Sequence, residues 1–293
     1  MQTSFVRSTQ MAMLALLLAG TFSGLRISAQ TVQVPPAPPG GLNYSKLPDV
    51  MGINLGMPVQ QAVAIVKSKW PAGQVNLFYT KFANSSDPAW ISRVTAKRPG
   101  TGLNQANSVD DITVFFSAPP NPQVVVQVLR TSTMIPPTAR GNLVAALRQK
   151  YGPELKQAPG YNMAWEFDEQ GQPVAKMPMG YMCTTFNQPP QATQGTASPP
   201  EALNLAPPFV EPIDGDIPRL VNMCKDAITI TTLVNAGQDP NQLLSTSTVD
   251  MIDHAEDLRD YVATARYSQK LASAAADKQK QQQLKNAPGA PQL

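Results

Sequence analysis

The sequence predicts an α+β protein of two tandem units, each built from a helix that packs on antiparallel strands. A helical segment with one apolar stripe occurs at residues 52–71, and residues 144–151 repeat its second half 81 positions after residues 63–70. Both helices are followed by runs in which apolar and polar residues alternate, the pattern of half-buried strands. A duplicated helix-plus-sheet unit accounts for both observations.

The first unit covers residues 44–135 and begins with a helix. Pro58 stands in the first turn, where proline is tolerated. The apolar positions of this helix, at helical spacing, are Ala62, Val63, Val66 and Trp70. Later in the unit, Asp110 and Asp111 precede the strand at residues 112–117 and predict a turn. Alternation then predicts strands at residues 75–82, 89–96, 112–117 and 124–130.

The second unit covers residues 136–271 and carries a long insertion. Its helix, residues 138–151, ends at Gly152. A hairpin turns at residues 168–172, and the insertion, residues 187–218, contains eight prolines. Further strands are expected at residues 163–167, 173–176, 179–186 and 228–234, with a last short strand or helix entry at 248–252.

A C-terminal helix is expected from about Asp253 to just past Leu271. Beyond it the apolar stripe gives way to alanine, glutamine and lysine, so we expect residues 272–293 to form a frayed polar tail. The apolar stripe of the helix is Ala255, Leu258, Val262 and Ala265.

The first 29 residues have the pattern of a secretory signal peptide. Arg7 precedes an apolar run at residues 11–19, and small residues predict cleavage between Ala29 and Gln30. An uncleaved anchor is the alternative reading. Residues 30–43 form a proline-rich leader expected to be disordered. The mature chain then has no transmembrane span and is expected in a periplasm or outside the cell.

The charge of the chain argues against nucleic acid as a partner. The formal net charge is +3, and loss of residues 1–29 with Arg7 and Arg26 lowers it to +1. Nucleic-acid binding requires a clustered basic surface, which a nearly neutral chain does not predict.

Cys183 and Cys224, the two cysteines, are expected to form a disulfide in an oxidising compartment. Closing a loop of about 40 residues would stabilise the fold by roughly 4 kcal/mol. Two separate buried thiols are the alternative. A metal site would need further soft ligands that the chain lacks, so we assign no metal or cofactor.

No residue is assigned a catalytic role. His254, the sole histidine, reads as a polar residue on the surface of the C-terminal helix. Glycosidases use two carboxyls that face each other, and neighbouring acids supply candidates for such pairs. Those candidate pairs are Asp110 with Asp111, Asp168 with Glu169, and Asp214 with Asp216. The acids at helical spacing, which predict a solvated face, are Asp250, Asp253, Asp257 and Asp260.

The aromatic residues favour packing over ligand binding. Trp70 and Tyr151 occupy equivalent positions at the ends of the two helices, where they would seal each helix against its sheet. Trp90 and Trp165 lie in predicted strands and are the candidate binding surface, because an uncovered sheet face or edge is a natural docking site.

The Gly56-Met57 turn, the helix after it and the exit at Trp70-Pro71 resemble the small envelope modules of the BamE/SmpA type. The tandem arrangement is similar to the architecture of the β-lactamase inhibitory protein family. The chain departs from these modules because it has no lipid-attachment cysteine and its second copy lacks Gly-Met. The resemblance implies a non-catalytic, protein-binding role in the bacterial envelope.

We therefore expect an exported, non-enzymatic protein-binding or scaffolding protein whose partner is an envelope or extracellular protein. The alternative is an envelope glycan hydrolase that uses carboxylates such as Asp110, Asp111 or Asp168.

Overall fold

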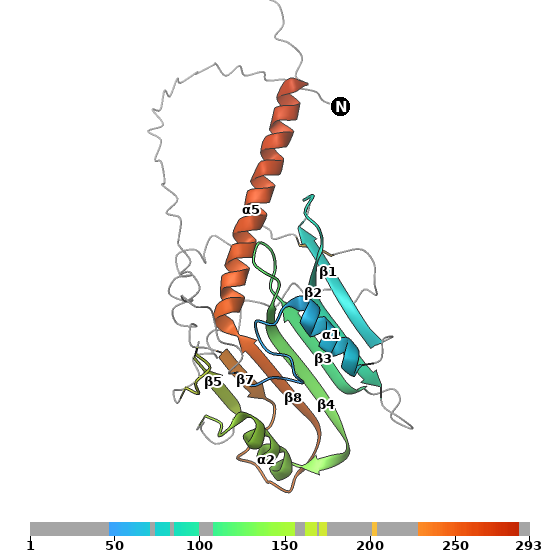
Figure 1. The fold of residues 1–293 in the computed structure, drawn as a ribbon, viewed down its shortest axis with the longest axis vertical. Coiled ribbons are helices and arrows are strands. Elements are labelled where there is room, and N and C mark those ends of the chain that lie inside the picture. The colour runs from blue at the N-terminus through green and yellow to red at the C-terminus, as the bar shows by residue number, and fades with distance from the viewer. Residues whose placement is uncertain are drawn as a thin grey trace, which may run out of the picture. The chain divides into compact units, whose positions relative to one another are not determined.

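One antiparallel sheet with three helices accounts for the described part of the chain (Figure 1). The signal segment, the leader, both cysteines, the strand expected at residues 179–186 and nearly all of the proline-rich insertion lie outside that part. The α+β class is confirmed, with sheet as its larger share. The computed structural model describes residues 47–70, 74–82, 85–99, 108–155, 162–168, 170–174, 201–203 and 228–286.

Four strands from the first half of the chain pair in sequence order. The turn expected at Asp110 and Asp111 is wrong, because both residues belong to the third strand and lie opposite Arg98 and Lys97 of the second. The third and fourth strands are also longer than expected. The four are β1 (Val75–Phe82), β2 (Trp90–Pro99), β3 (Ser108–Phe116) and β4 (Val125–Ala139).

Strands from the second half extend the same sheet at both edges: β8, β7 and β5 continue it beyond β4, and β6 pairs with β1. The strand order is β5-β7-β8-β4-β3-β2-β1-β6, and each neighbouring pair is antiparallel except β1 and β6. The middle of the sheet is the pairing of β4 with β8, in which Val128 lies opposite Met251. The added strands are β5 (Ala164–Phe167), β6 (Glu201–Leu203), β7 (Ile228–Thr232) and β8 (Leu243–Asp253).

Helix α1 (Val59–Lys69) begins after Pro58, as its sequence predicts. The turn before it places Gly56 at a φ of 70°, a left-handed conformation that glycine adopts without a steric cost. The predicted apolar stripe of the helix is buried, and Trp70 closes it with 2% of its surface exposed. Lys67 and Lys69 lie in the last turn, where positive charge suits the helix dipole.

Helix α2 (Arg140–Tyr151) follows β4 directly and ends at Gly152, whose φ is 83°. Its buried face includes Val144, Leu147 and Tyr151, which join the same hydrophobic core as α1. Both helices lie on one face of the sheet (Figure 1).

A row of directly paired side chains runs across six strands beneath α1 and α2. These residues are buried and belong to the shared core. Burying such a side chain contributes roughly 1.5–3 kcal/mol. The row therefore holds together strands from both halves of the chain. Its members are Val94, Val114, Val128, Met251, Ile230 and Trp165.

Helix α5 (His254–Lys285) leaves the end of β8. The side chain of Asp253 accepts a hydrogen bond from the backbone N–H of Glu256 at 2.9 Å and caps the helix. The predicted apolar stripe is buried. The helix runs 14 residues beyond Leu271, where we expected it to give way to a frayed tail, and residues 272–285 are exposed. Alanine, glutamine and lysine are strong helix formers, which explains the extension. None of the described helices has the length and apolar character needed to cross a bilayer.

Candidate binding surface

The face of the sheet that points away from α1 and α2, called here the distal face, carries a mixture of apolar and polar side chains. Successive side chains of a strand point to opposite faces of the sheet. In each strand, the residues directly before and after the buried row therefore contribute to the distal face. Its central residues are half-buried. They are Phe78, Arg93, Thr95, Thr113, Phe115, Gln127, Leu129, Thr131, Thr248, Asp250 and Ile252.

Side-chain pairs fix the conformations of the distal face. The guanidinium carbon of Arg93 lies 4.1 Å from the centre of the Phe78 ring, a cation–π contact. The amide nitrogen of Gln127 donates to Asp250 Oδ1 at 2.9 Å. Burial raises the pKa of the Asp250 carboxyl, and the hydrogen bond from Gln127 acts in the opposite direction. A surface with restrained side chains loses little entropy when a partner binds.

Threonines are frequent on this face and stand opposite one another. The hydroxyls of Thr131 and Thr248 lie 3.3 Å apart across β4 and β8. Thr95 pairs with Thr113 on β2 and β3. At β7 the distal face contacts α5. There, Thr229 Oγ1 lies 2.9 Å from Nε2 of His254.

The structure corrects the expectation that Trp90 and Trp165 form an exposed surface. Trp165 is 3% exposed, its ring centre lies 5.2 Å from that of Tyr151, and its Nε1 donates to the Gly152 carbonyl at 2.9 Å. It therefore closes the core beneath α2. A tryptophan in a strand fits either face of a sheet, so sequence alone could not place it.

Trp90 is also buried, with 5% of its surface exposed. Its ring centre lies 4.8 Å from that of Phe82, and the Phe82 ring packs edge-on against Tyr267 of α5 at 5.3 Å. Trp90 thus supports the contact between the sheet and α5.

Asp110 and Asp111 do not form a facing carboxylate pair. Adjacent residues of a strand point to opposite faces. The carboxylate of Asp110 is buried and accepts hydrogen bonds from Arg130 at 2.9 Å and Ser132 at 3.3 Å. Asp111 lies on the distal face, where burial raises the pKa of its carboxyl while Lys97 lowers it. Asp110 is held in a structural ion pair.

Asp168 stabilises its own hairpin turn. One oxygen of its carboxylate accepts hydrogen bonds from the backbone N–H groups of Gln170 at 2.9 Å and Gln172 at 2.8 Å. Its candidate partner Glu169, and the pair Asp214 and Asp216, lie outside the described residues. In the described ranges no group of three or more acids, histidines or cysteines is placed to hold a metal ion.

The start of α5 differs most from expectation. The acids at helical spacing are not a solvated face, because Asp253, Asp257 and Asp260 are all buried, and His254 is buried too. Asp260 hydrogen bonds to the connection between β3 and β4, more than a hundred residues earlier. The spacing of these acids matches that of the apolar stripe, but the sequence contains no signal for their distant partners.

No protein-family model, no curated protein and no solved structure matches this chain. The resemblance to envelope modules of the BamE/SmpA type therefore depends on the motif residues alone.

Proposed function

We propose that the chain is an exported, non-enzymatic protein-binding or scaffolding protein and that the distal face is its binding surface. The observation that carries this proposal is the division of the sheet into two unlike faces. One is covered by α1 and α2 and carries the hydrophobic core, whereas the other, apart from its contact with α5 at β7, presents a half-buried, ordered mixture of side chains across several strands.

The composition of the distal face suits recognition of a protein. Arginine and aromatic residues are enriched where interfaces concentrate their binding energy, and this face contains Arg93 stacked on Phe78, with Phe115 on β3. Leu129, opposite Thr113 and Asp250, supplies an apolar centre. Such a surface, supported by a rigid sheet, suits binding to a protein, and we propose an envelope or extracellular protein as the partner.

We also propose that the sheet is composed of two tandem units related by a local twofold axis. Support comes from the centre of the sheet, where Val128 of β4 and Met251 of β8 lie directly opposite each other in an antiparallel pair. Trp70 and Tyr151 close equivalent helices on the same face. We keep the proposed unit boundaries at residues 44–135 and 136–271, with the proline-rich insertion in the second, although β4 (Val125–Ala139) crosses the boundary by four residues.

Exchange of the aromatic residues tests the tandem proposal. If both helices use the same packing arrangement, Tyr151→Trp should cost less than about 1.5 kcal/mol in the free energy of unfolding by urea. Val144→Trp, a matched overpacking of the same helix at a site without an aromatic equivalent, should cost clearly more. Equal costs would argue against equivalent packing.

Export and a bond between Cys183 and Cys224 complete the proposal. Cleavage after Ala29 predicts Gln30 as the first residue of the purified mature protein. Unchanged gel mobility after reduction, together with full thiol labelling of the denatured protein without reductant, would contradict the disulfide.

Partner capture from a native envelope extract tests the binding surface. Leu129→Arg places a charge at the centre of the distal face, and we expect at least tenfold weaker capture, which corresponds to about 1.4 kcal/mol. Gln61→Arg is the control, because Gln61 is exposed on α1, which covers the opposite face. Circular dichroism should show that both variants are folded.

Retained capture by Leu129→Arg and by a second distal-face variant, Thr113→Arg, would contradict the surface assignment. Polysaccharide hydrolysis that disappears in Asp111→Asn would instead support the glycan hydrolase alternative.

A further inference from the structure

Helix α5 is attached to the sheet at a buried carboxylate. The two oxygens of Asp260 lie 3.1 and 2.9 Å from the backbone nitrogen of Ala118, which donates to them. The side-chain amide of Asn121 donates to the same carboxylate at 2.9 Å. Ala118 and Asn121 belong to the connection between β3 and β4. We call these three residues the clasp.

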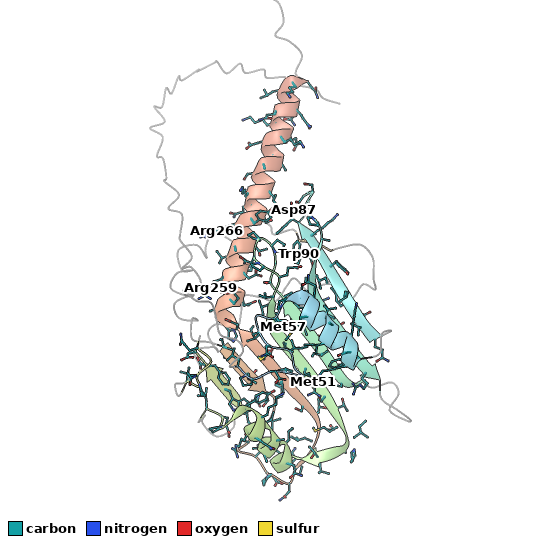
Figure 2. All side chains as sticks on the ribbon, in the orientation of Figure 1. Met51, Met57, Asp87, Trp90, Arg259 and Arg266 are labelled. Carbon is teal, nitrogen blue, oxygen red and sulfur yellow. The ribbon has the colours of Figure 1, made fainter. Side chains whose placement is uncertain are left out.

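Two further contacts hold the same part of the helix. Thr264 Oγ1 donates to the Pro119 carbonyl at 3.3 Å, one turn beyond the clasp. Tyr267 donates to Asp87 at 3.0 Å, in the connection between β1 and β2. Figure 2 shows Asp87 and Trp90 beside the middle of α5. The helix is therefore fastened to two strand connections, and the clasp is the only one of these polar contacts made by a buried acid.

The surroundings of Asp260 disfavour its negative charge. It is 5% exposed, and burial raises the pKa of its carboxyl to about 7, while the hydrogen bonds from Asn121 and Ala118 lower it. Glu256, one turn earlier, raises the pKa further and is 3.4 Å from Arg259.

The other charged groups near the clasp lie on α5 and on the β1–β2 connection. Asp257 precedes Asp260 by three residues on α5 and is buried as well. Asp87 accepts the hydrogen bond from Tyr267. Residues 118–123, which pack against Asp260, contain no charged side chain. The β3–β4 connection therefore donates hydrogen bonds to the Asp260 carboxylate but supplies no positive charge to balance it.

We propose that protonation of Asp260 controls how tightly α5 is held to the sheet, so that the helix is clasped firmly in acid and loosely above neutral pH. The proposal is independent of the binding role of the distal face.

The direction in which pH changes the attachment of α5 follows from proton linkage. A detached helix exposes Asp260 to water, where the carboxyl has its usual pKa of 3.8, whereas the attached carboxyl has a pKa of about 7. Between these values the attached state binds a proton that the detached state does not. Attachment is therefore strongest below pH 3.8 and weakens as pH rises through 7. From pH 5.5 to 8.5 the attachment constant should fall roughly thirtyfold.

Release would expose an apolar surface. The stripe of α5 that the sheet covers includes Leu258 and Val262, and the ring of Tyr267 would separate from Phe82 above Trp90. A rise in pH would thus uncover side chains that are buried when Asp260 is protonated.

Amide hydrogen exchange along α5 tests the proposal in the full chain. After correction for the intrinsic pH dependence of exchange, protection of residues 255–267 should fall roughly thirtyfold between pH 5.5 and 8.5. In Asp260→Asn the same residues should show equal protection at both pH values. Asp250→Asn is the matched control, because Asp250 is another acid whose carboxyl pKa is raised by burial but it bonds to Gln127 within the sheet.

A second variant keeps the test decisive if Asp260→Asn fails to fold. Asn121→Ala removes a donor that lowers the pKa of Asp260, so the midpoint of the pH response should move to higher pH. Equal protection of wild-type α5 at both pH values would overturn the proposal. So would a full pH response in Asp260→Asn, or an unmoved midpoint in Asn121→Ala.

Discussion

Replacing Trp70 tests whether the end of α1 is sealed as the structure indicates. Its indole Nε1 donates to the backbone carbonyl of Asp110 at 3.1 Å, and the side chain is buried. Trp70→Phe keeps an aromatic ring but removes this donor. Leaving a buried carbonyl without its hydrogen bond costs about 1–3 kcal/mol. The smaller ring also loses the burial of a few carbon atoms, at roughly 0.8 kcal/mol for each methylene equivalent.

Together these two effects predict that Trp70→Phe destabilises the fold by about 2–4 kcal/mol. Trp70→Ala should cost about 3–5 kcal/mol, since it also leaves a cavity. Urea unfolding followed by far-ultraviolet circular dichroism measures both changes, because the signal does not depend on the replaced indole.

Tyr151→Phe supplies the comparison at the end of α2. Burial raises the pKa of the Tyr151 hydroxyl to about 12, and no residue in the described ranges forms a hydrogen bond with it. Its loss should change the free energy of unfolding by less than about 0.5 kcal/mol. If Trp70→Phe proves as mild as Tyr151→Phe, the hydrogen bond to the Asp110 carbonyl contributes little to the stability of the fold.

Three further predictions concern the end of α2. Gly152→Ala should cost about 1–3 kcal/mol in thermal unfolding. Gly152 has a φ of 83° and a ψ of −171°, a backbone conformation that is essentially restricted to glycine, although an added methyl group meets no atom within 4 Å; an unchanged melting temperature would contradict this backbone strain. Trp165→Phe should lower the free energy of unfolding in urea by about 1–3 kcal/mol, since Nε1 no longer donates to the Gly152 carbonyl; an unchanged free energy would show that this hydrogen bond does not stabilise the fold. The Arg148 hydrogen bond lowers the pKa of Glu154, so this pair stabilises the fold above pH 4.5 and loses its effect as pH falls below that. Both groups are near the surface, so Glu154→Gln should cost under about 1 kcal/mol at pH 7, and a nuclear magnetic resonance titration showing an undisplaced Glu154 would contradict the pair.

The elements set by local pattern were predictable. The strand at residues 75–82 has the expected ends, and α1 begins directly after Pro58, because alternation, helical spacing and proline act within a few residues. The stripe of α5 was also found from spacing. Its extension to Lys285 was missed, because high helix propensity continues after the apolar stripe has ended.

Features that depend on distant partners were not predictable. Asp110 suggested a turn when considered locally, yet Arg130 and Ser132 satisfy its carboxylate from the neighbouring strand. Asp260 suggested a solvated helix face, yet its donors belong to a connection 139 to 142 residues earlier. Polar character in the sequence does not show whether a buried partner exists.

The candidate surface illustrates the same limit. Trp90 and Trp165 were identified as strand aromatics, but the face that each one occupies depends on the strand order and on the side that α1 and α2 cover. The distal face has no motif of its own, because it consists of the alternate residues of strands that come from both halves of the chain.

The pairing of β4 with β8 at the centre of the sheet has a consequence for synthesis. Val128 and Met251 are separated by 123 residues, so closing the chain between them costs about 4 kcal/mol of loop entropy, against about 2 kcal/mol for the Phe115–Gln127 pair of β3 and β4. The first four strands can therefore pair early, while β4 keeps an unpaired row of backbone groups until β8 has been made. The middle of the finished sheet is an exposed edge in the growing chain, at the stage when pairing with another molecule is the main hazard.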